Sequence, residues 1–278
     1  MKKVCVITGG GKGMGLEAAK YMGRDRTLVL SGRTVAKLEE AVQKLSDMGI
    51  EAHPFACDVS KREEVRALAE YAASLGTITN VINAAGISPH MGEGDTILRI
   101  NALGTVHVNQ EFSRRMERGT VIVDVSSNSA YVLPHFLVSE KIYALADTDE
   151  ERFVEKILKR CKMAKEGYQR NGFAYAFSKN FVIWYAKKSA YEYGAHGIRV
   201  CSLSPGLIAT DMGKLEEDEG GSLIPNTAEE RMGYPEELGF ALATVADERN
   251  GYLAGVDVLC DGGATYGKKF KARNKKSV

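Results

Sequence analysis

Two hydrophobic periodicities alternate along this chain. Short apolar runs rich in β-branched residues predict buried strands, and most are followed by a stretch in which apolar residues recur at helical spacing. The predicted strands cover residues 2–8, 27–31, 52–57, 120–125, 198–204 and 255–260, with one more ending at 83. The predicted helices include 16–22, 35–48, 61–75 and 235–246. Strands that alternate with helices in this way predict an α/β fold, a single doubly wound domain around about seven parallel strands.

The alternation is interrupted between residues 128 and 172. Apolar residues recur there at helical spacing from Phe153 to Cys161, after a possible capping box formed by Thr148 and Glu151. We therefore expect an inserted helical segment before the next long helix. This segment either only packs against the domain or also walls a substrate site.

Two further segments are polar. Residues 211–235 follow a predicted strand, and we expect them to form a substrate loop. Within it, the acidic, glycine-bearing stretch 214–231 is either a solvated loop or a mobile lid over a substrate site. Residues 268–278 hold six lysines and arginines among eleven residues, and we expect them to form a solvated, poorly ordered basic tail. Since the chain has no internal repeat and no Pro/Ser-rich linker, we expect one domain over residues 1–267.

Composition excludes several classes of function. The 37 basic and 36 acidic residues give a net charge of +1, so no bulk field attracts nucleic acid or a membrane surface. The five cysteines are scattered without metal-ligand spacing, which argues for a reducing compartment and against a zinc site. A strand is predicted directly at the N-terminus and no apolar run approaches the ~20 residues that span a bilayer, so we expect a cytoplasmic protein without signal peptide.

A glycine-rich loop joins the first predicted strand to the first helix. It reads Thr-Gly-x-x-x-Gly-x-Gly, with Thr8, Gly9, Gly13 and Gly15. Strand, glycine loop and helix together direct backbone N–H groups and the positive end of a helix at a phosphate. The loop therefore predicts a dinucleotide site.

The end of the second predicted strand bears on the choice of dinucleotide. An acidic side chain near this point would bind the adenosine ribose, but the strand ends in Gly32 and Arg33. Arg33 and Lys12 are two cations suited to a 2′-phosphate. We therefore expect NADP(H) to be preferred, with NAD(H) possible.

Tyr175 and Lys179 are the strongest candidates for chemistry. Residues four apart on a helix lie one turn above the other on the same face. A free phenol titrates near pH ~10, and a lysine one turn away favours the phenolate, as an acid or base near neutrality requires.

Two weaker candidates lie elsewhere. Ser126 and Ser127 follow the fifth predicted strand at its carboxyl end, where open α/β sheets bind ligands, although serines there also cap turns. Asn101 lies on an otherwise apolar helix, where an amide is often only a satisfied polar group of the core.

The order of these motifs resembles the short-chain dehydrogenase/reductase family over about residues 2–263. The matching segments are TGGGKGMG at 8–15, Asp58-Val59, Asn83-Ala-Ala-Gly86, Ser127, Tyr175-x-x-x-Lys179 and Pro205-Gly-x-x-x-Thr210. The resemblance implies a Rossmann-type fold and an enzyme that is an NAD(P)-dependent oxidoreductase.

The resemblance also implies a role for each matching residue. Tyr175 would exchange a proton with the substrate oxygen, and Ser127, rather than Ser126, would hydrogen-bond that oxygen. Lys179 would lower the pKa of Tyr175 and hold the nicotinamide ribose, and Asn101 would anchor a water that relays protons to it. Thr210 would bond the carboxamide. The implied cofactor-binding residues are Thr8, Gly9, Gly11, Lys12, Gly13, Met14, Gly15, Arg33, Asp58, Val59, Asn83, Ala84, Ala85, Gly86, Tyr175, Lys179, Pro205, Gly206 and Thr210.

The gap between serine and tyrosine departs from the usual family pattern. Ser127 and Tyr175 are 48 residues apart, much farther than in typical members. The insertion resembles that of the bacterial 3α-hydroxysteroid dehydrogenase/carbonyl reductase branch. The amino-acid sequence of residues 174–180 resembles the same branch. The substrate would then be a hydroxysteroid or another bulky hydrophobic carbonyl, interconverted between secondary alcohol and ketone.

Alternatives remain for the substrate and for the class of protein. A 3-oxoacyl thioester or a small metabolite is a second substrate class, and a nucleotide-binding redox sensor or scaffold with little activity is the rival class. Apolar residues near the expected site suit a hydrophobic ketone and packing equally well; they are Tyr131, Leu133, Phe136, Leu137 and Met212. We expect a homo-oligomer, a dimer or tetramer. Family members usually pair through helices corresponding to 94–117 and 173–193, and the insertion could block that face.

Overall fold

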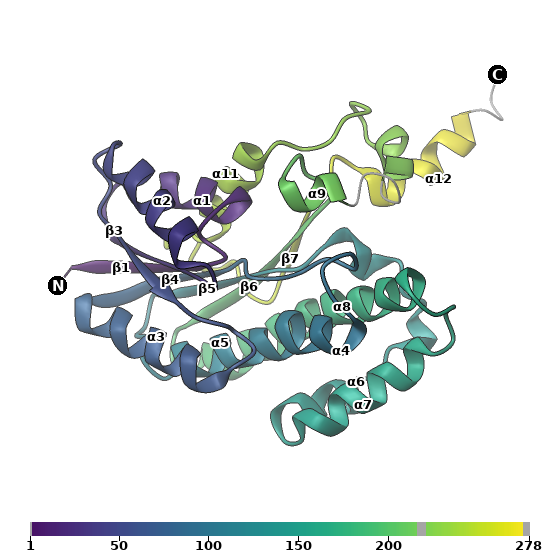
Figure 1. Cartoon of the computed structure of the whole chain (residues 1–278), viewed down its shortest axis with the longest axis horizontal. Helices are drawn as coiled ribbons and strands as arrows, with labels where there is room; N and C mark the ends of the chain where they lie inside the picture. The colour runs from purple at the N-terminus through teal and green to yellow at the C-terminus, as the bar shows by residue number, and fades with distance from the viewer. Residues whose placement is uncertain (1, 216–220, 275–278) are drawn as a thin grey trace.

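The computed structural model, which describes residues 2–215 and 221–274, contains one seven-stranded parallel sheet between layers of helices (Figure 1). The strand order is β3-β2-β1-β4-β5-β6-β7. The strands are β1 (Lys3–Thr8), β2 (Thr27–Gly32), β3 (Ala52–Ala56), β4 (Thr77–Asn83), β5 (Val121–Val125), β6 (Arg199–Pro205) and β7 (Asp257–Cys260). The predicted doubly wound α/β fold is confirmed.

Helices cover both faces of the sheet. One face carries α1 (Gly13–Met22), α2 (Val35–Ser46) and α11 (Pro235–Val245). The other carries α3 (Arg62–Leu75), α4 (Gly94–Ile97), the π-helix η1 (Leu98–Leu103), α5 (Gly104–Ser113) and α8 (Tyr168–Gly194). In β1, Cys5 and Ile7 join the first core and Val4 and Val6 the second, so the strand is apolar on both faces from Val4 to Ile7 rather than alternating.

The topology creates a crevice at the carboxyl ends of the strands. β1 lies between β2 and β4, and the chain crosses from one half of the sheet to the other after β3. Ligands of doubly wound sheets bind at such a reversal, beyond the carboxyl ends of the strands. The glycine loop, Arg33, Gly86 and Ser127 each follow one of these strand ends.

The insertion folds as a helical layer against α8. It contains η2 (Asn128–Tyr131), η3 (His135–Leu137), α6 (Glu140–Tyr143), η4 (Ala144–Asp147) and α7 (Glu150–Cys161). Phe153 and Ile157 of α7 are buried in a third core with Phe181 of α8. The capping box expected at Thr148 and Glu151 is wrong by one residue, because the Asp149 carboxylate caps α7 by accepting the N–H of Arg152 at 3.0 Å.

The polar segments contain more helix than expected. After β6 come α9 (Asp211–Leu215) and η5 (Gly221–Asn226), while 216–220 of the expected lid lie outside the described residues. The helix α12 (Ala264–Asn274) crosses the boundary expected at residue 267, so the basic tail is helical as far as Asn274, and 275–278 lie outside the described residues. None of the described helices has the length and apolar character needed to cross a membrane.

Candidate active site

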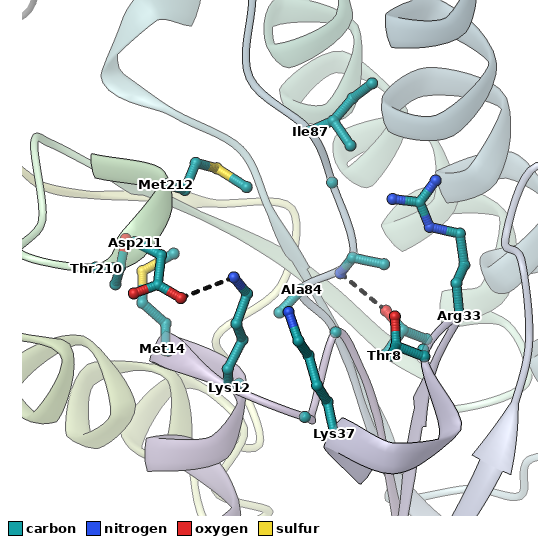
Figure 2. Close-up of a pocket in the computed structure, with 18 of the residues that line it drawn as sticks. Thr8, Lys12, Met14, Arg33, Lys37, Ala84, Ile87, Thr210, Asp211 and Met212 are labelled. Carbon is teal, nitrogen blue, oxygen red and sulfur yellow. Dashed lines mark hydrogen bonds and ion pairs between the residues drawn. The ribbon is translucent and has the colours of Figure 1, made fainter. Parts of the chain in front are cut away.

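A cleft of about 540 Å³ lies beyond the carboxyl ends of β1, β2 and β4. Figure 2 shows side chains from the glycine loop, from the strand ends and from the segment after β6 around it. The predicted cofactor residues that line this cleft are Thr8, Gly9, Gly11, Lys12, Gly13, Met14, Gly15, Arg33, Asp58, Val59, Ala84, Ala85, Gly86 and Thr210. Residues far apart in the sequence are therefore brought together as expected.

The glycine loop forms a close backbone cradle. Gly9 has φ +66°, and a Cβ atom there would lie 2.8 Å from the carbonyl oxygen of Ala84. A Cβ atom at Gly15 would lie 2.6 Å from the carbonyl oxygen of Gly9, so α1 can start close to the strand only with glycine at this position. Among the described residues, no side chain caps the N-terminus of α1. Its backbone amide groups and the positive end of the helix can therefore bind a pyrophosphate.

The cations around the cleft are arranged differently from expectation. Lys12 donates to Asp211 at 2.9 Å, and Figure 2 shows it pointing toward Asp211 while Arg33 lies across the cleft. Lys37, in the first turn of α2, also lines the cleft and was not among the predicted residues. The sequence feature that indicates Lys37 is its position four residues after Arg33, at the start of the helix that follows β2.

Tyr175 and Lys179 lie together on α8 beside this cleft. The Lys179 ammonium is 5.8 Å from the Tyr175 ring centroid and donates to the carbonyl of Val125 at 2.9 Å. A Cβ atom at Gly86 would lie 3.4 Å from Lys179 Nζ and 3.1 Å from Asn101 Oδ1. Burial lowers the pKa of Lys179 to about 8, and the carboxyl of Asp124 opposes this shift. The site therefore holds a desolvated lysine next to a phenol.

Asn101 lies in the π-helix that interrupts the α4–α5 helix. Its Nδ2 donates to the carbonyl of Ile87 at 3.0 Å, and its Oδ1 accepts the N–H of Ile87 at 2.9 Å. These bonds fix the loop after β4 that carries Gly86. Short π-helical segments are frequent at functional sites because they re-aim individual residues.

The two serines after β5 have different partners. Ser126 Oγ donates to the backbone carbonyl of Lys179 at 2.7 Å, so this hydroxyl joins β5 to α8. Ser127 Oγ accepts the N–H of Ser129 at 3.2 Å, and that bond does not use its own proton. Ser127 therefore keeps a donor for a substrate oxygen.

Five predicted cofactor residues are absent from the described lining of the cleft. Tyr175 and Lys179 lie beside it on α8, whereas Asn83, Pro205 and Gly206 belong to the sheet or to its strand ends. Asn83 is buried, donating to Asp124 at 3.0 Å and accepting from Thr8 Oγ1 at 2.8 Å. Pro205 ends β6, and the N–H of Gly206 donates to the carbonyl of Cys260 at 3.1 Å.

The apolar candidates mostly serve packing. Leu133 and Leu137 belong to the core between α7 and α8, and the Tyr131 hydroxyl donates to Asp257 at 2.5 Å. Phe136 is 82% exposed. From this set only Met212 appears among the described residues of the cleft lining, where the unexpected Ile87 and Met91 join it.

Comparisons with known proteins agree with this geometry. A family model described as short chain dehydrogenase matches residues 3–139, and one described as enoyl-(acyl carrier protein) reductase matches residues 157–265. The chain is 30% identical to the short-chain dehydrogenase/reductase bsc3 of Alternaria brassicicola, over 93% of this chain and 94% of the relative. It is 28% identical to D-threitol dehydrogenase of Mycolicibacterium smegmatis, over 95% and 93%. A short chain dehydrogenase from Burkholderia cenocepacia, solved in complex with NADP, has a similar fold with a TM-score of 0.75 at 22% identity, over 94% and 97%.

Proposed function

The chain belongs to the short-chain dehydrogenase/reductase family and is an NAD(P)-dependent oxidoreductase, and we propose that it interconverts a bulky hydrophobic ketone and its secondary alcohol with NADP(H) as preferred cofactor. We propose Ser127, Tyr175, Lys179 and Asn101 as the catalytic residues. The observation that carries the proposal is the buried Lys179 ammonium 5.8 Å from the centroid of the Tyr175 ring, beside the cleft that the glycine loop lines.

Each residue has a distinct task in this proposal. The bound nicotinamide supplies or accepts the hydride. Tyr175 exchanges a proton with the substrate oxygen, and the positive charge of Lys179 favours the phenolate that this exchange requires. Ser127 donates a hydrogen bond to the same oxygen as charge develops on it. Asn101 holds the loop of Ile87 against the site.

Tyr175→Phe tests the enzyme against the rival class, a nucleotide-binding sensor. The variant lacks only the hydroxyl, so NADPH binding should persist while turnover falls by about 10²–10⁴-fold, the usual contribution of a positioned acid or base. NADPH affinity is measured by fluorescence titration and turnover by NADPH oxidation. The control is Tyr191→Phe, which removes the hydroxyl of a 90% exposed tyrosine on α8. Retained turnover in Tyr175→Phe would contradict the catalytic assignment.

Arg33→Ala tests the cofactor preference. Arg33 is a guanidinium at the end of β2, and a charged hydrogen bond to a 2′-phosphate contributes about 1.5–3 kcal/mol. The Kd for NADPH should rise by one to two orders of magnitude, with NADH affinity unchanged. Lys37→Ala, measured beside it, tells whether the lysine shares this contact. Equal affinity of the unmodified protein for NADH and NADPH would contradict the preference.

The substrate class is proposed from the apolar part of the cleft. Ile87, Met91 and Met212 are apolar residues among those that line the cleft. Initial rates with a 3-ketosteroid, a small aromatic ketone and a 3-oxoacyl thioester, each with NADPH and NADH, decide among the three classes. Exclusive turnover of the thioester would replace the hydrophobic ketone by the second substrate class.

We also propose a homo-oligomer that does not use the usual helical face. Glu150 at the start of α7 is 3.0 Å from His107 Nε2 on α5, and the ring of Phe153 on α7 packs 5.0 Å from that of Phe181 on α8. The insertion thus lies over the helices through which family members usually pair. Sedimentation equilibrium measures the mass, and a monomer at micromolar concentration would contradict the proposal.

A further inference from the structure

A buried carboxyl group lies on β5, the strand whose backbone accepts the ammonium of the proposed catalytic lysine. Asp124 is on β5 and 0% exposed, one residue before Val125, whose carbonyl accepts the Lys179 ammonium. Its Oδ1 accepts from Asn83 Nδ2 at 3.0 Å, and its Oδ2 accepts from Asn109 Nδ2 at 2.9 Å. Both carboxyl oxygens thus accept from amide donors, which is the arrangement that an ionised carboxylate requires.

The two amides satisfy the oxygens but do not balance the charge. A buried carboxylate without a counter-charge is costly, and so is a buried ammonium. Lys179 is buried as well, and each group favours the charged form of the other: Lys179 lowers the pKa of Asp124, and Asp124 raises the pKa of Lys179. Burial dominates both, raising the pKa of Asp124 to about 7 and lowering that of Lys179 to about 8.

The surroundings contain few other titratable groups. β4 presents Asn83 and α5 presents Asn109 and Thr105, which are neutral. β6 places Ser202 beside Asp124 in register, and the neighbouring Cys201 thiol also experiences the Asp124 charge. On α8 the titratable neighbour is Lys179, whose ammonium lies 5.8 Å from the centroid of the Tyr175 ring. Among the described residues, Lys179 is therefore the cation that acts on Asp124.

We propose that Asp124 is a positioning residue that keeps the Lys179 ammonium charged inside the protein and thereby sets the pH range in which Tyr175 exchanges its proton. The inference rests on the proposed catalytic roles of Tyr175 and Lys179. Asp124 acts through Lys179, because its side chain is fully buried and its two carboxyl oxygens accept from Asn83 and Asn109 inside the protein.

The first test is the pH profile of alcohol oxidation by Asp124→Asn. Without the carboxylate, Lys179 loses its proton at lower pH, and Tyr175 loses the cation that favours its phenolate. The acid limb of kcat/KM should therefore move to higher pH by about one unit. Glu111→Gln is the matched control, because it neutralises another buried carboxylate, on α5, whose partners are arginines. An unchanged pH profile would mean that Asp124 has only a structural role. A move of the acid limb to lower pH would mean that Asp124 acts on Tyr175 directly. Either result overturns the proposal.

The second test uses the nucleotide-free protein and needs no turnover. Because the folded state raises the pKa of Asp124, this group favours folding below about pH 4, and that contribution is lost as pH rises toward about 7. The stability of the unmodified protein relative to Asp124→Asn should fall over this window in urea unfolding. The same comparison is made in a Lys179→Met background, where loss of the cation should move the midpoint of the fall to higher pH.

A midpoint that does not move would show that the two groups are uncoupled and would refute the inference, whatever the activity. Conversely, full turnover by Tyr175→Phe would refute the proposed catalytic roles while leaving the coupling measurable. If Asp124→Asn does not fold, Asp124→Ser replaces it in both tests, since a hydroxyl can still accept from Asn83.

Discussion

Ser126→Ala and Ser127→Ala separate a structural hydroxyl from a catalytic one at adjacent positions. Ser126 Oγ donates to the carbonyl of Lys179 at 2.7 Å and is buried, so its proton is already committed to a bond between β5 and α8. Ser127 Oγ accepts the N–H of Ser129 at 3.2 Å and keeps its proton. Ser126→Ala should therefore mainly lower the stability of the protein, whereas Ser127→Ala should mainly lower its turnover.

The magnitudes follow from these bonds. Ser127→Ala removes a donor to the oxygen on which charge develops, and such a loss lowers kcat by about 10²–10³-fold, or about 2.7–4 kcal/mol. Its cost in stability is that of a cap, ~1 kcal/mol. Ser126→Ala removes a buried neutral hydrogen bond, ~0.5–1.5 kcal/mol of unfolding free energy. Its turnover should stay within about tenfold, because the 27-residue helix α8 holds Lys179 independently of that bond.

Two measurements on both variants decide the matter: kcat/KM for ketone reduction and urea unfolding without nucleotide. Ser127→Thr keeps a hydroxyl and serves as control, with activity between that of the unmodified protein and Ser127→Ala. If Ser126→Ala lost a hundredfold in kcat/KM while Ser127→Ala stayed within tenfold, the assignment of the donor would be reversed. Equal losses in both would mean that bond geometry does not distinguish the two hydroxyls.

Two further predictions concern the insertion. Phe153→Ala opens a cavity in the fully buried core between α7 and α8 and should cost about 3–5 kcal/mol in urea unfolding, whereas Phe136→Ala, at an 82% exposed position, should change stability by ~0.5 kcal/mol or less. Equal effects would show that α7 is not part of the core. The hydrogen bond to His107 holds the pKa of Glu150 at about 2, so this carboxylate stabilises the fold above about pH 4.5 and loses that effect as pH falls toward 2. Glu150→Gln should therefore show a shallower loss of thermal stability between pH 4.5 and 2, and an unchanged acid limb would contradict the pairing.

The order of elements and the cofactor loop could be predicted from the sequence because they depend on local chemistry. Buried parallel strands require continuous apolar runs, and the close approach at Gly9 and Gly15 requires glycine. Tyr175 and Lys179 could be paired for the same reason, since helical geometry alone places residues four apart on one face. Their catalytic roles are still to be tested.

Other features depended on partners that are distant in the sequence. Lys12 carries the same charge in any fold, but its pairing with Asp211, 199 residues away, turns it from Arg33. Leu133 could equally have lined a substrate site, and only the packing of α7 on α8 made it part of the core.

Asp124 illustrates the division most clearly. Its sequence context is that of one polar residue in an apolar strand, and nothing local indicates which groups it meets. Asn109 and Asn83, 15 and 41 residues away, reach its oxygens only after α5 and β4 have packed against β5. The sequence by itself determined which elements form, because hydrophobic periodicity and backbone sterics act over a few residues. The tertiary structure decided which polar groups meet inside the protein, because burial and charge act between elements that only the fold brings together.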